Sequence, residues 1–334
     1  MNSWFNPNEP QNTVAISTRI RLARNINSIP FPSKMTLEQF KAVNEAVRKV
    51  IDESDAPVAK TLKYISMDNI PEIERYAMVE RHIISRKFAS DYQNRAIIIS
   101  EDESICIMLG EEDHIRIQVL LAGLQFERAY EIANEIDEIL CGGLDLAFDS
   151  RIGFLTECPT NLGTGLRASL MLHLPILEDR GEIGTLADSI GKIGLTVRGM
   201  YGEGSKAIAS LYQISNQVTL GISEKNAIDN LKIIASQLIT KEKESRKQLD
   251  MMRLEDRCMR SYGVLKNARI LTSDELMSRV SDMMLGLSVG ILKCNIWPMS
   301  IFIEGQPHMI MRKMGEMSSE SRDIERANMV RNSF

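Results

Sequence analysis

The chain lacks the features that would place it in a membrane, outside the cell or on nucleic acid. None of its apolar runs approaches the length of a membrane-spanning helix. Residues 1–10 lack the basic and apolar regions of a signal peptide, so no secretion signal is expected. No block of Lys or Arg occurs and the formal net charge is −5, which argues against a tail that binds nucleic acid.

Cysteines that could pair are also missing. The five cysteines are scattered, odd in number and without a Cys-x-x-Cys pair: Cys106, Cys141, Cys158, Cys258 and Cys294. This pattern predicts reduced thiols in a cytoplasmic protein, with neither a disulfide framework nor a zinc knuckle. A hydrophobic content of 44% is ordinary for a soluble globular protein. The length of 334 residues predicts two domains rather than one.

The spacing of apolar residues predicts an α+β protein with a mainly antiparallel sheet flanked by helices. Thr36 is expected to cap a helix over 37–51, and a long amphipathic helix is expected to follow Ile117. Hairpin-like spacing of the later strands favours antiparallel pairing. The expected strands are 95–99, 105–109, 146–154, 194–198, 206–214 and 217–221.

The last third of the chain has a different pattern. From Ser223 onward the sequence is almost wholly helical, and the stretch 241–250 is very polar. We therefore expect a first domain over 12–244 and a helical C-terminal domain over 245–334.

The most informative segment is 157–167, Glu-Cys-Pro-Thr-Asn-Leu-Gly-Thr-Gly-Leu-Arg. Thr160 and Asn161 are good helix N-caps, and 167–172 is expected to be helical. A thiol at Cys158 would then lie near the positive end of a helix dipole, which favours the thiolate. Arg167 adds a fixed positive charge suited to phosphate.

Other strings contain further charged residues at suggestive positions. The run 110–116, Gly-Glu-Glu-Asp-His-Ile-Arg, follows an expected strand and is expected to open a helix. The run 196–204 ends a strand in a glycine-rich loop, and Arg19 and Arg21 are two apart, which aims both at one face of a strand. A convergent set of arginines requires an anionic ligand, and their forks match phosphate oxygens, so a polyphosphate is expected. The set is Arg19, Arg21, Arg116, Arg167 and Arg198.

The run 199–206 superficially looks like a Walker A loop, G-x-x-x-x-G-S-K. In a P-loop the lysine precedes the Ser or Thr and a helix follows. Here Lys206 comes after Ser205, and the residues that follow are typical of a strand. The sequence therefore argues against a P-loop.

Together these strings resemble the guanidino (phosphagen) kinases, whose CPTNxGT signature matches 158–164. The resemblance covers roughly residues 12–240 and implies the catalytic domain of that family. It implies ATP and Mg²⁺ as cofactors, with the metal held mostly by the nucleotide and water rather than by a protein cage. It also places His82 near the adenine and ribose. The nucleotide-binding set it implies is Ser17, Thr18, Arg19, Ile20, Arg21, His82, Arg116, Arg167, Ala168, Ser169, Leu170, Met171, Arg198, Gly199, Met200, Tyr201, Gly202 and Glu203.

The same resemblance implies the catalytic residues. A guanidinium is a poor nucleophile until it loses a proton, and carboxylates can both orient it and accept that proton. Glu112 and Glu203 match the two family glutamates with this role. Cys158 would orient the guanidinium rather than attack phosphorus, while Glu111 and Asp113 are expected to serve structure or electrostatics.

Two departures from the small-molecule kinases indicate the acceptor. Those kinases have a helical domain of about a hundred residues before the Arg-x-Arg motif, whereas Arg19 stands almost at the start of this chain. We therefore expect that domain to be absent and the site to be open. The added segment 245–334 also resembles the bacterial protein arginine kinases, the McsB family, which phosphorylate arginine side chains of proteins.

A string near the end of the chain supports the same family. Residues 321–327, Ser-Arg-Asp-Ile-Glu-Arg-Ala, match the RDxxRA motif of the protein arginine kinases, implied there to bind phosphoarginine away from the active site. Arg322, Asp323 and Arg326 would form that allosteric site. From spacing alone, the string is a salt-bridged surface helix.

The resemblance also implies partners. These are a heat-shock repressor and misfolded proteins as substrates, the Clp unfoldase and protease machinery, and a zinc-binding activator protein. A homodimer or larger assembly is expected, with no direct contact to nucleic acid or membrane.

Three alternatives remain open at this point. The chain could phosphorylate free arginine or another small guanidino compound, or it could be a catalytically silent adaptor with the same fold. The adaptor is disfavoured because the cysteine, both glutamates and all five arginines are retained. A cysteine hydrolase with Cys158 as nucleophile and His114 or His173 as base is weak, because neither histidine has a recognisable triad context.

Overall fold

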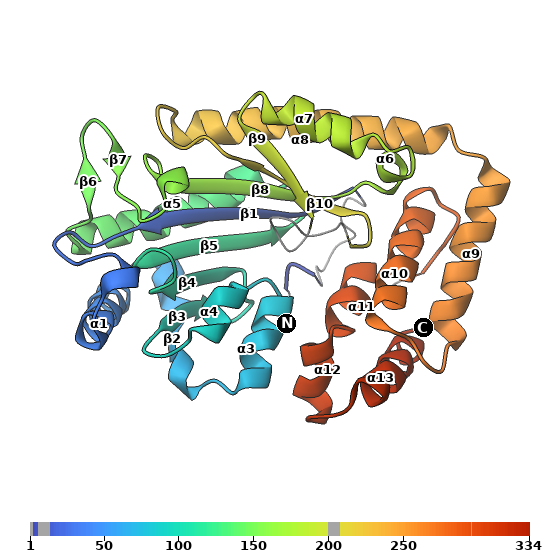
Figure 1. Ribbon diagram of the computed structural model, residues 1–334, viewed down its shortest axis with the longest axis horizontal. Helices are drawn as coiled ribbons and strands as arrows, with labels where there is room; N and C mark the ends of the chain where they lie inside the picture. The colour runs from blue at the N-terminus through green and yellow to red at the C-terminus, as the bar shows by residue number, and fades with distance from the viewer. Residues whose placement is uncertain (1–2, 6–13, 200–207, 295) are drawn as a thin grey trace.

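The structure is a computed structural model that describes residues 3–5, 14–199, 208–294 and 296–334. Its centre is an eight-stranded sheet in the order β2-β3-β4-β5-β1-β8-β10-β9, and every neighbouring pair is antiparallel (Figure 1). The α+β class and the antiparallel sheet are thus confirmed. The strands are β1 Ala15–Arg24, β2 Leu62–Ser66, β3 Ala96–Ser100, β4 Ile105–Leu109, β5 Ile115–Ala122, β8 Leu166–His173, β9 Leu195–Gly199 and β10 Leu211–Asn216.

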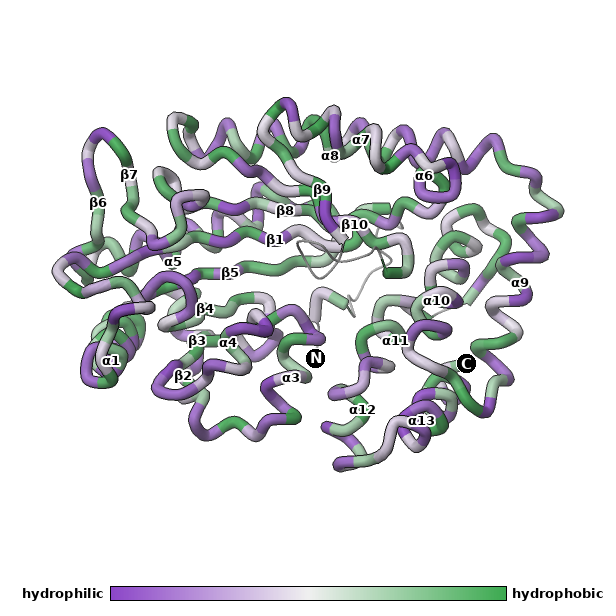
Figure 2. Tube along the Cα trace, in the orientation of Figure 1, coloured by the Kyte–Doolittle hydropathy of each residue, from purple (hydrophilic) through white to green (hydrophobic). Residues whose placement is uncertain are grey.

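Helices cover one face of this sheet and leave the middle of the other for the site. The helices of the first domain are α1 Leu37–Glu53, α2 Pro57–Lys60, α3 Glu72–Glu80, α4 Arg86–Ser90, α5 Phe126–Gly143, α6 Pro175–Asp179, α7 Ile183–Gly191 and α8 Glu224–Lys247. Apolar side chains of α1, α5 and α8 form a core with those of the strands. Figure 2 shows β3 and β4 as mainly hydrophobic, and both strands are buried along their whole length.

The central strand β1 illustrates how alternation separates core from site. Ile20 and Leu22 are fully buried against the helices. Arg19 and Arg21 alternate with them, so their side chains project from the opposite face. The expectation that these two arginines share a face is confirmed.

Helix α1 begins and ends where its sequence predicts. The hydroxyl of Thr36 accepts a hydrogen bond from the Gln39 amide, and the Gln39 side chain accepts one from the Thr36 amide, which completes a capping box.

The long helix expected after Ile117 is present and ends at Gly143, but its start was predicted too early. Residues up to Ala122 form β5, and the helix α5 begins only at Phe126. Leu120 and Leu121 therefore lie in a strand. The strand is mostly buried on both faces, so its apolar residues do not alternate and instead imitate a helical period.

The helix expected over 167–172 was wrong for the same reason, since these residues lie in β8. The strand expected over 146–154 is two short strands, β6 Phe148–Asp149 and β7 Gly153–Phe154, joined as a hairpin. Residues 217–221 form no strand. Thr219 in this segment lies against the cysteine segment. The backbone N–H of Thr164 donates a hydrogen bond to the Thr219 carbonyl at 3.1 Å.

The C-terminal region is wholly helical among its described residues, as expected. Its helices are α9 Met251–Asn267, α10 Ser273–Ser288, α11 Pro298–Glu304, α12 Pro307–Met314 and α13 Ser319–Asn332. Their core also takes in Ile16, Met171 and Leu211 of the strands, together with Trp4. Each such side chain, when fully buried, contributes about 1.5–3 kcal/mol, so the helices are docked on the sheet by apolar contact.

The polar stretch 241–250 contains the end of α8 at Lys247 and the N-cap of α9 at Asp250. The boundary between 244 and 245 stays a prediction. Among the described residues, no helix has the length and apolar character needed to cross a bilayer.

Candidate active site

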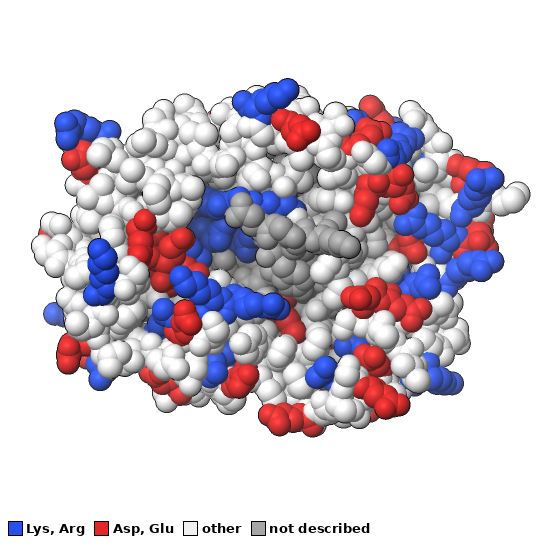
Figure 3. Space-filling model, viewed as in Figure 1, with Lys and Arg blue, Asp and Glu red and all other residues white. Residues whose placement is uncertain are grey.

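Five arginines of the sheet line a cavity of about 480 Å³ on its open face, together with Arg86 of α4. Figure 3 shows blue side chains gathered in a hollow at the middle of this face. The sheet register brings them together, because residues paired across neighbouring strands lie about 5 Å apart. Arg21 is paired with Arg167, and Arg198 with Gln213. The five, from β1, β5, β8 and β9, are Arg19, Arg21, Arg116, Arg167 and Arg198.

The cluster is electrostatically costly without an anion. Burial lowers the pKa of Arg21 well below its usual range, and repulsion from Arg19, Arg116 and Arg167 lowers it further. Burial together with the same kind of repulsion lowers the pKa of Arg19 to about 10. The buried Nε of Arg21 has no hydrogen-bond partner among the described residues. A bound phosphate chain would relieve the repulsion between these arginines, so the residues present fit ATP.

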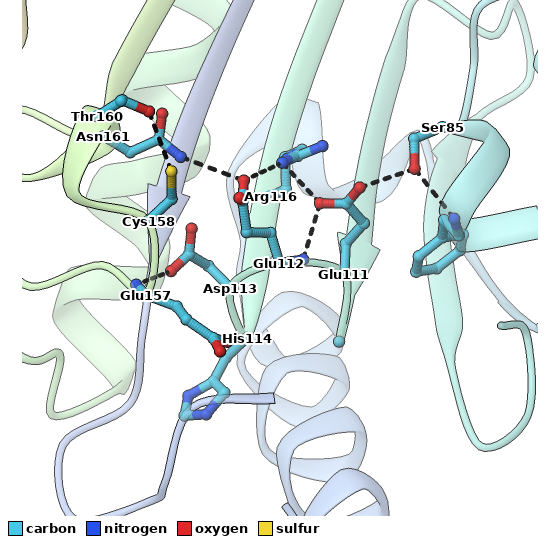
Figure 4. A network of polar contacts seen from close by, with 12 residues as sticks. Ser85, Glu111, Glu112, Asp113, His114, Arg116, Glu157, Cys158, Thr160 and Asn161 are labelled. Carbon is cyan, nitrogen blue, oxygen red and sulfur yellow. Dashed lines mark hydrogen bonds and ion pairs between the residues drawn. The ribbon is translucent and has the colours of Figure 1, made fainter. Parts of the chain in front are cut away.

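Arg116 is held by two neighbouring carboxylates (Figure 4). Its Nη2 lies 2.6 Å from Oε2 of Glu111 and 3.1 Å from Oε2 of Glu112. Glu111 also accepts hydrogen bonds from the Ser85 hydroxyl at 2.7 Å and from the Glu112 amide at 2.8 Å. Burial opposes ionisation of Glu111, but Arg116, Ser85 and this amide outweigh it and lower its pKa. Glu111 is therefore a fixed anion that positions Arg116.

Glu112 and Cys158 border a second cavity of about 370 Å³. It shares four arginines with the first cavity: Arg21, Arg116, Arg167 and Arg198. The Cys158 Sγ lies 3.0 Å from the Thr160 hydroxyl, and the Asn161 amide donates to Glu112 Oε2 at 3.4 Å. A guanidino group placed there would meet a carboxylate and a thiol on one side and the arginine cluster on the other.

The local structure at the cysteine differs from the expected helix. Cys158 precedes a single 3₁₀ turn, Pro159–Asn161, and neither Thr160 nor Asn161 caps an α-helix. One such turn has no extended dipole, so Cys158 does not lie at the positive end of a helix dipole, contrary to the prediction.

Asp113 ties the two catalytic segments together. It is buried, and its Oδ1 accepts hydrogen bonds from the Asn25 side chain at 2.7 Å and from the Glu157 amide at 2.8 Å. Burial raises its pKa despite these bonds. Because Glu112 precedes Asp113 and Cys158 follows Glu157, this contact fixes the distance between the carboxylate and the thiol, which agrees with the structural role expected for Asp113.

His82 lies in the lining of the larger cavity, as expected for a residue near the nucleotide. Burial, with a smaller contribution from Arg19, lowers its pKa to about 3. The imidazole is therefore neutral at ordinary pH and offers a ring face and hydrogen-bonding atoms rather than charge.

Strand alternation divides the remaining expected nucleotide-binding residues into two groups. Ser17, Ser169 and Met171 line a small cavity beside His82 and Arg19. Ile20, Ala168 and Leu170 are fully buried in the core on the other face, and the Thr18 hydroxyl donates to the Gly123 carbonyl at 2.7 Å. The side chains of this second group therefore do not reach the cavity.

The structure describes the glycine-rich run 196–204 only as far as Gly199. Gly199 ends β9 and is buried. Met200, Tyr201, Gly202 and Glu203 lie outside the described residues, so the expected second catalytic glutamate stays a prediction.

The structure adds residues that the sequence did not single out. Gln213 of β10 accepts a hydrogen bond from Arg19 Nη2 at 2.5 Å, and Arg86 and Gln118 also line the cavity. Both glutamines lie in strands that contain other polar or charged residues, so no sequence pattern distinguishes them. His114 and His173, the bases of the hydrolase alternative, do not line the cavity that contains Cys158.

Comparisons with known proteins agree with this geometry. A family model described as ATP:guanido phosphotransferase, C-terminal catalytic domain, matches residues 42–245. A second, described as the protein-arginine kinase McsB C-terminal domain, matches residues 251–334. The protein-arginine kinase of Brevibacillus brevis is 42% identical over 339 residues, which covers 98% of this chain and 94% of that protein. The chain belongs to the protein-arginine kinase family.

Other relatives extend this result. The protein-arginine kinase of Caldanaerobacter subterraneus subsp. tengcongensis is 40% identical over 322 residues, covering 95% of this chain and 96% of that protein. The crystal structure of lombricine kinase matches with a TM-score of 0.59 and 23% identity, covering 72% of this chain and 70% of that one. At 23% identity the match to lombricine kinase supports the phosphagen-kinase fold alone. The chain is thus an enzyme, a phosphotransferase of the guanidino-kinase family.

Proposed function

We propose that this enzyme transfers the γ-phosphoryl group of ATP to the guanidino group of arginine side chains in proteins. The observation that supports it most directly is a cluster of five arginines beside a carboxylate and a thiol, in two cavities that share four of the arginines. The arginines bind the phosphates and stabilise the charge that spreads over them during transfer. The family membership favours a guanidino group as the acceptor.

In the reaction, a guanidino nitrogen forms a bond to the γ-phosphorus while the bond from that phosphorus to the bridging oxygen breaks, and ADP leaves. The nitrogen loses a proton, and Glu112 is the described carboxylate placed to accept it. Arg116, fixed by Glu111, aligns Glu112 with the phosphates. Cys158 orients the guanidinium, and Glu203 is proposed as the second carboxylate that holds it.

Mg²⁺ bound with ATP would neutralise phosphate charge and polarise the leaving oxygen. Among the described residues, no group of three acidic, His or Cys side chains is placed to hold a metal ion. We therefore propose that the phosphates and water provide most of its ligands, with the arginine cluster beside them.

The acceptor is proposed to be an arginine within a polypeptide rather than the free amino acid. The match of residues 251–334 to the protein-arginine kinase C-terminal domain supports this choice. We further propose a cytoplasmic role in stress response and protein quality control. A heat-shock repressor and misfolded proteins would be substrates, a zinc-binding protein an activator, the Clp machinery a downstream partner, and a homodimer or larger assembly the working form.

The test is a comparison of two acceptors at equal guanidino concentration. The purified enzyme is incubated with ATP, Mg²⁺ and either an arginine-rich protein or free arginine, with Glu112→Gln as the inactive control. We expect an acid-labile phosphoryl group, mapped to arginine by mass spectrometry, and a far higher kcat/KM for the protein. Similar values for the two acceptors would assign the chain to the small-molecule kinases.

A further inference from the structure

The C-terminal domain makes a specific contact with the segment that carries His82. Glu80, the last residue of α3, lies against the start of α12. Its Oε1 accepts a hydrogen bond from the His308 amide at 3.0 Å and lies 2.8 Å from His308 Nδ1, while its Oε2 accepts from the Met309 amide at 2.9 Å. Glu80 is buried. Gln306, the residue before α12, makes no side-chain cap, so a carboxylate from the other domain caps this helix.

Ion pairs strengthen the same contact. Arg81, which is fully buried, donates from Nε to Glu103 at 2.9 Å and from Nη2 to Glu74 at 2.9 Å, and its Nη1 lies 3.4 Å from the Met309 sulfur. Arg312 of α12 reaches the other oxygen of Glu74 at 2.6 Å. Two consecutive residues at the end of α3 are thus anchored to α12.

The next residue is His82. Its φ is +61°, a conformation that a non-glycine residue adopts only when its surroundings enforce it. On the inner side, Gln118 donates to the His82 carbonyl at 2.9 Å. Trp4 donates from its indole nitrogen to the Arg81 carbonyl at 2.9 Å and packs edge-on against the His82 ring at 5.5 Å. The backbone at 80–82 is therefore fixed from both sides, and α12 provides the outer one.

We propose that Glu80 is a positioning residue for ATP binding, through which the C-terminal domain sets the place of His82 in the nucleotide cavity. This rests on the proposed function only in taking the cavity of His82 and the arginine cluster as the ATP site. Loss of the Glu80 carboxylate removes its bonds to the start of α12 and leaves only the Glu74 and Arg81 contacts, so the strained backbone at His82 can relax. The ring then leaves its place in the cavity wall, while Glu112 and Cys158 are untouched.

The decisive variant is Glu80→Gln, which keeps the size of the side chain but can accept at only one of its two ends. We expect the KM for ATP to rise about five-fold or more, the lower end of typical coupling between sites. The KM for the protein acceptor should stay as in the wild type. The matched control is Glu304→Gln in α11, which removes the 3.0 Å ion pair between Glu304 and Lys313 of α12 but leaves the contacts of α12 with α3 in place. This variant should bind ATP normally.

A double-mutant cycle separates positioning from general loss of structure. If Glu80 acts through His82, Glu80→Gln should add little to the KM for ATP in a His82→Ala background. An equal factor in both backgrounds, or an equal rise in both KM values, would overturn the proposal. Should Glu80→Gln fail to fold, His308→Ala removes one partner of Glu80 and leaves both amide bonds, so it should raise the KM for ATP by a smaller factor.

Direct ATP binding by titration calorimetry keeps this test independent of the acceptor. If the wild type binds ATP but phosphorylates no arginine, the proposed function fails while the comparison of ATP affinities still stands. If Glu80→Gln and His308→Ala both bind ATP as tightly as the wild type, the positioning role of Glu80 is wrong.

Discussion

The charged residues of the site divide into those with protein partners and those left for a ligand. Glu111 has its oxygens occupied by Ser85, Arg116 and a backbone amide. Arg21, in contrast, has a buried Nε without a partner among the described residues. Glu111 thus holds Arg116 in place, whereas Arg21 lines a cavity in which a phosphate chain can compensate the crowded positive charge.

At this scale the first prediction concerns Glu112 and Cys158. Glu112→Gln and Cys158→Ala should each lower kcat by about 10²–10⁴-fold. The first variant removes the carboxylate that takes the proton from the guanidino group, and the second removes the thiol that orients this group. ATP affinity should survive in both. Steady-state kinetics and calorimetry check this, with Glu131→Gln and Cys141→Ala on the far helix α5 as controls. Near-normal turnover in either variant would remove that residue from the catalytic set.

The second prediction separates two roles of Arg116. If its fork binds phosphate, Arg116→Lys should raise the KM for ATP about ten-fold, the value of one lost charge-assisted hydrogen bond. The control is Arg128→Lys, an exposed residue of α5 paired with Glu131. A KM for ATP unchanged beside a raised KM for the acceptor would show that Arg116 serves only to hold Glu112.

At the scale of elements, the position of the cysteine depends on a close backbone approach. Gly163 has a φ of +108°, and a Cβ there would lie 2.4 Å from the Thr219 carbonyl oxygen. The Thr219 hydroxyl in turn lies 2.8 Å from the carbonyl oxygen of Leu162. The turn after Cys158 is therefore clamped against residues 217–221, which explains why this segment forms no strand.

Gly163→Ala is accordingly expected to displace this turn. The backbone strain costs about 1–3 kcal/mol, and activity should fall further than stability because Cys158 and Asn161 move together. Thermal unfolding and kcat are measured side by side. Gly184→Ala in α7, where a Cβ meets nothing within 4 Å, is the control and should be neutral or slightly stabilising. A Gly163→Ala enzyme with full activity would contradict the close-approach argument.

Element types were predictable where local signals mark them. The short strands β3 and β4 are bounded by turn residues and were predicted correctly, although both are buried along their whole length. Helix α1 has an apolar stripe and a capping box, and both are legible in the sequence. Strands β5 and β8 are buried on both faces and read as helices. Their neighbours in the sheet, which are distant in sequence, supply the burial that decides the matter.

At the scale of the whole molecule, the RDxxRA helix is part of the C-terminal core. Arg326 is buried and donates to the carbonyls of Gly305 and Leu271 at 2.7 and 2.8 Å, and to Asp323 at 2.5 Å. Replacing it would leave buried carbonyls without donors, so Arg326 is unsuited to a test of ligand binding. Arg322 is only partly buried and contacts the Met311 sulfur at 3.6 Å.

The prediction for this helix therefore uses Arg322 and Asp323. Phosphoarginine is expected to stimulate the wild type, with the phosphoryl group bound by arginine and the guanidinium by Asp323. Arg322→Ala and Asp323→Asn should blunt the stimulation and leave basal activity intact. The control is Arg260→Ala on the exposed face of α9. If the Arg322 variant responds like the wild type, the helix has a structural role alone.

The sequence by itself determined the chemistry of this protein. Contiguous motifs identified Cys158, Glu112 and the five arginines, because each motif places its residues within one strand or turn. The tertiary structure decided how they meet. Antiparallel register brings Arg21 beside Arg167, and Asp113 ties the Glu112 turn to the cysteine segment. The tertiary structure also decided that Glu80, next to His82, caps the start of α12. No local sequence pattern encodes a contact between residues more than two hundred positions apart.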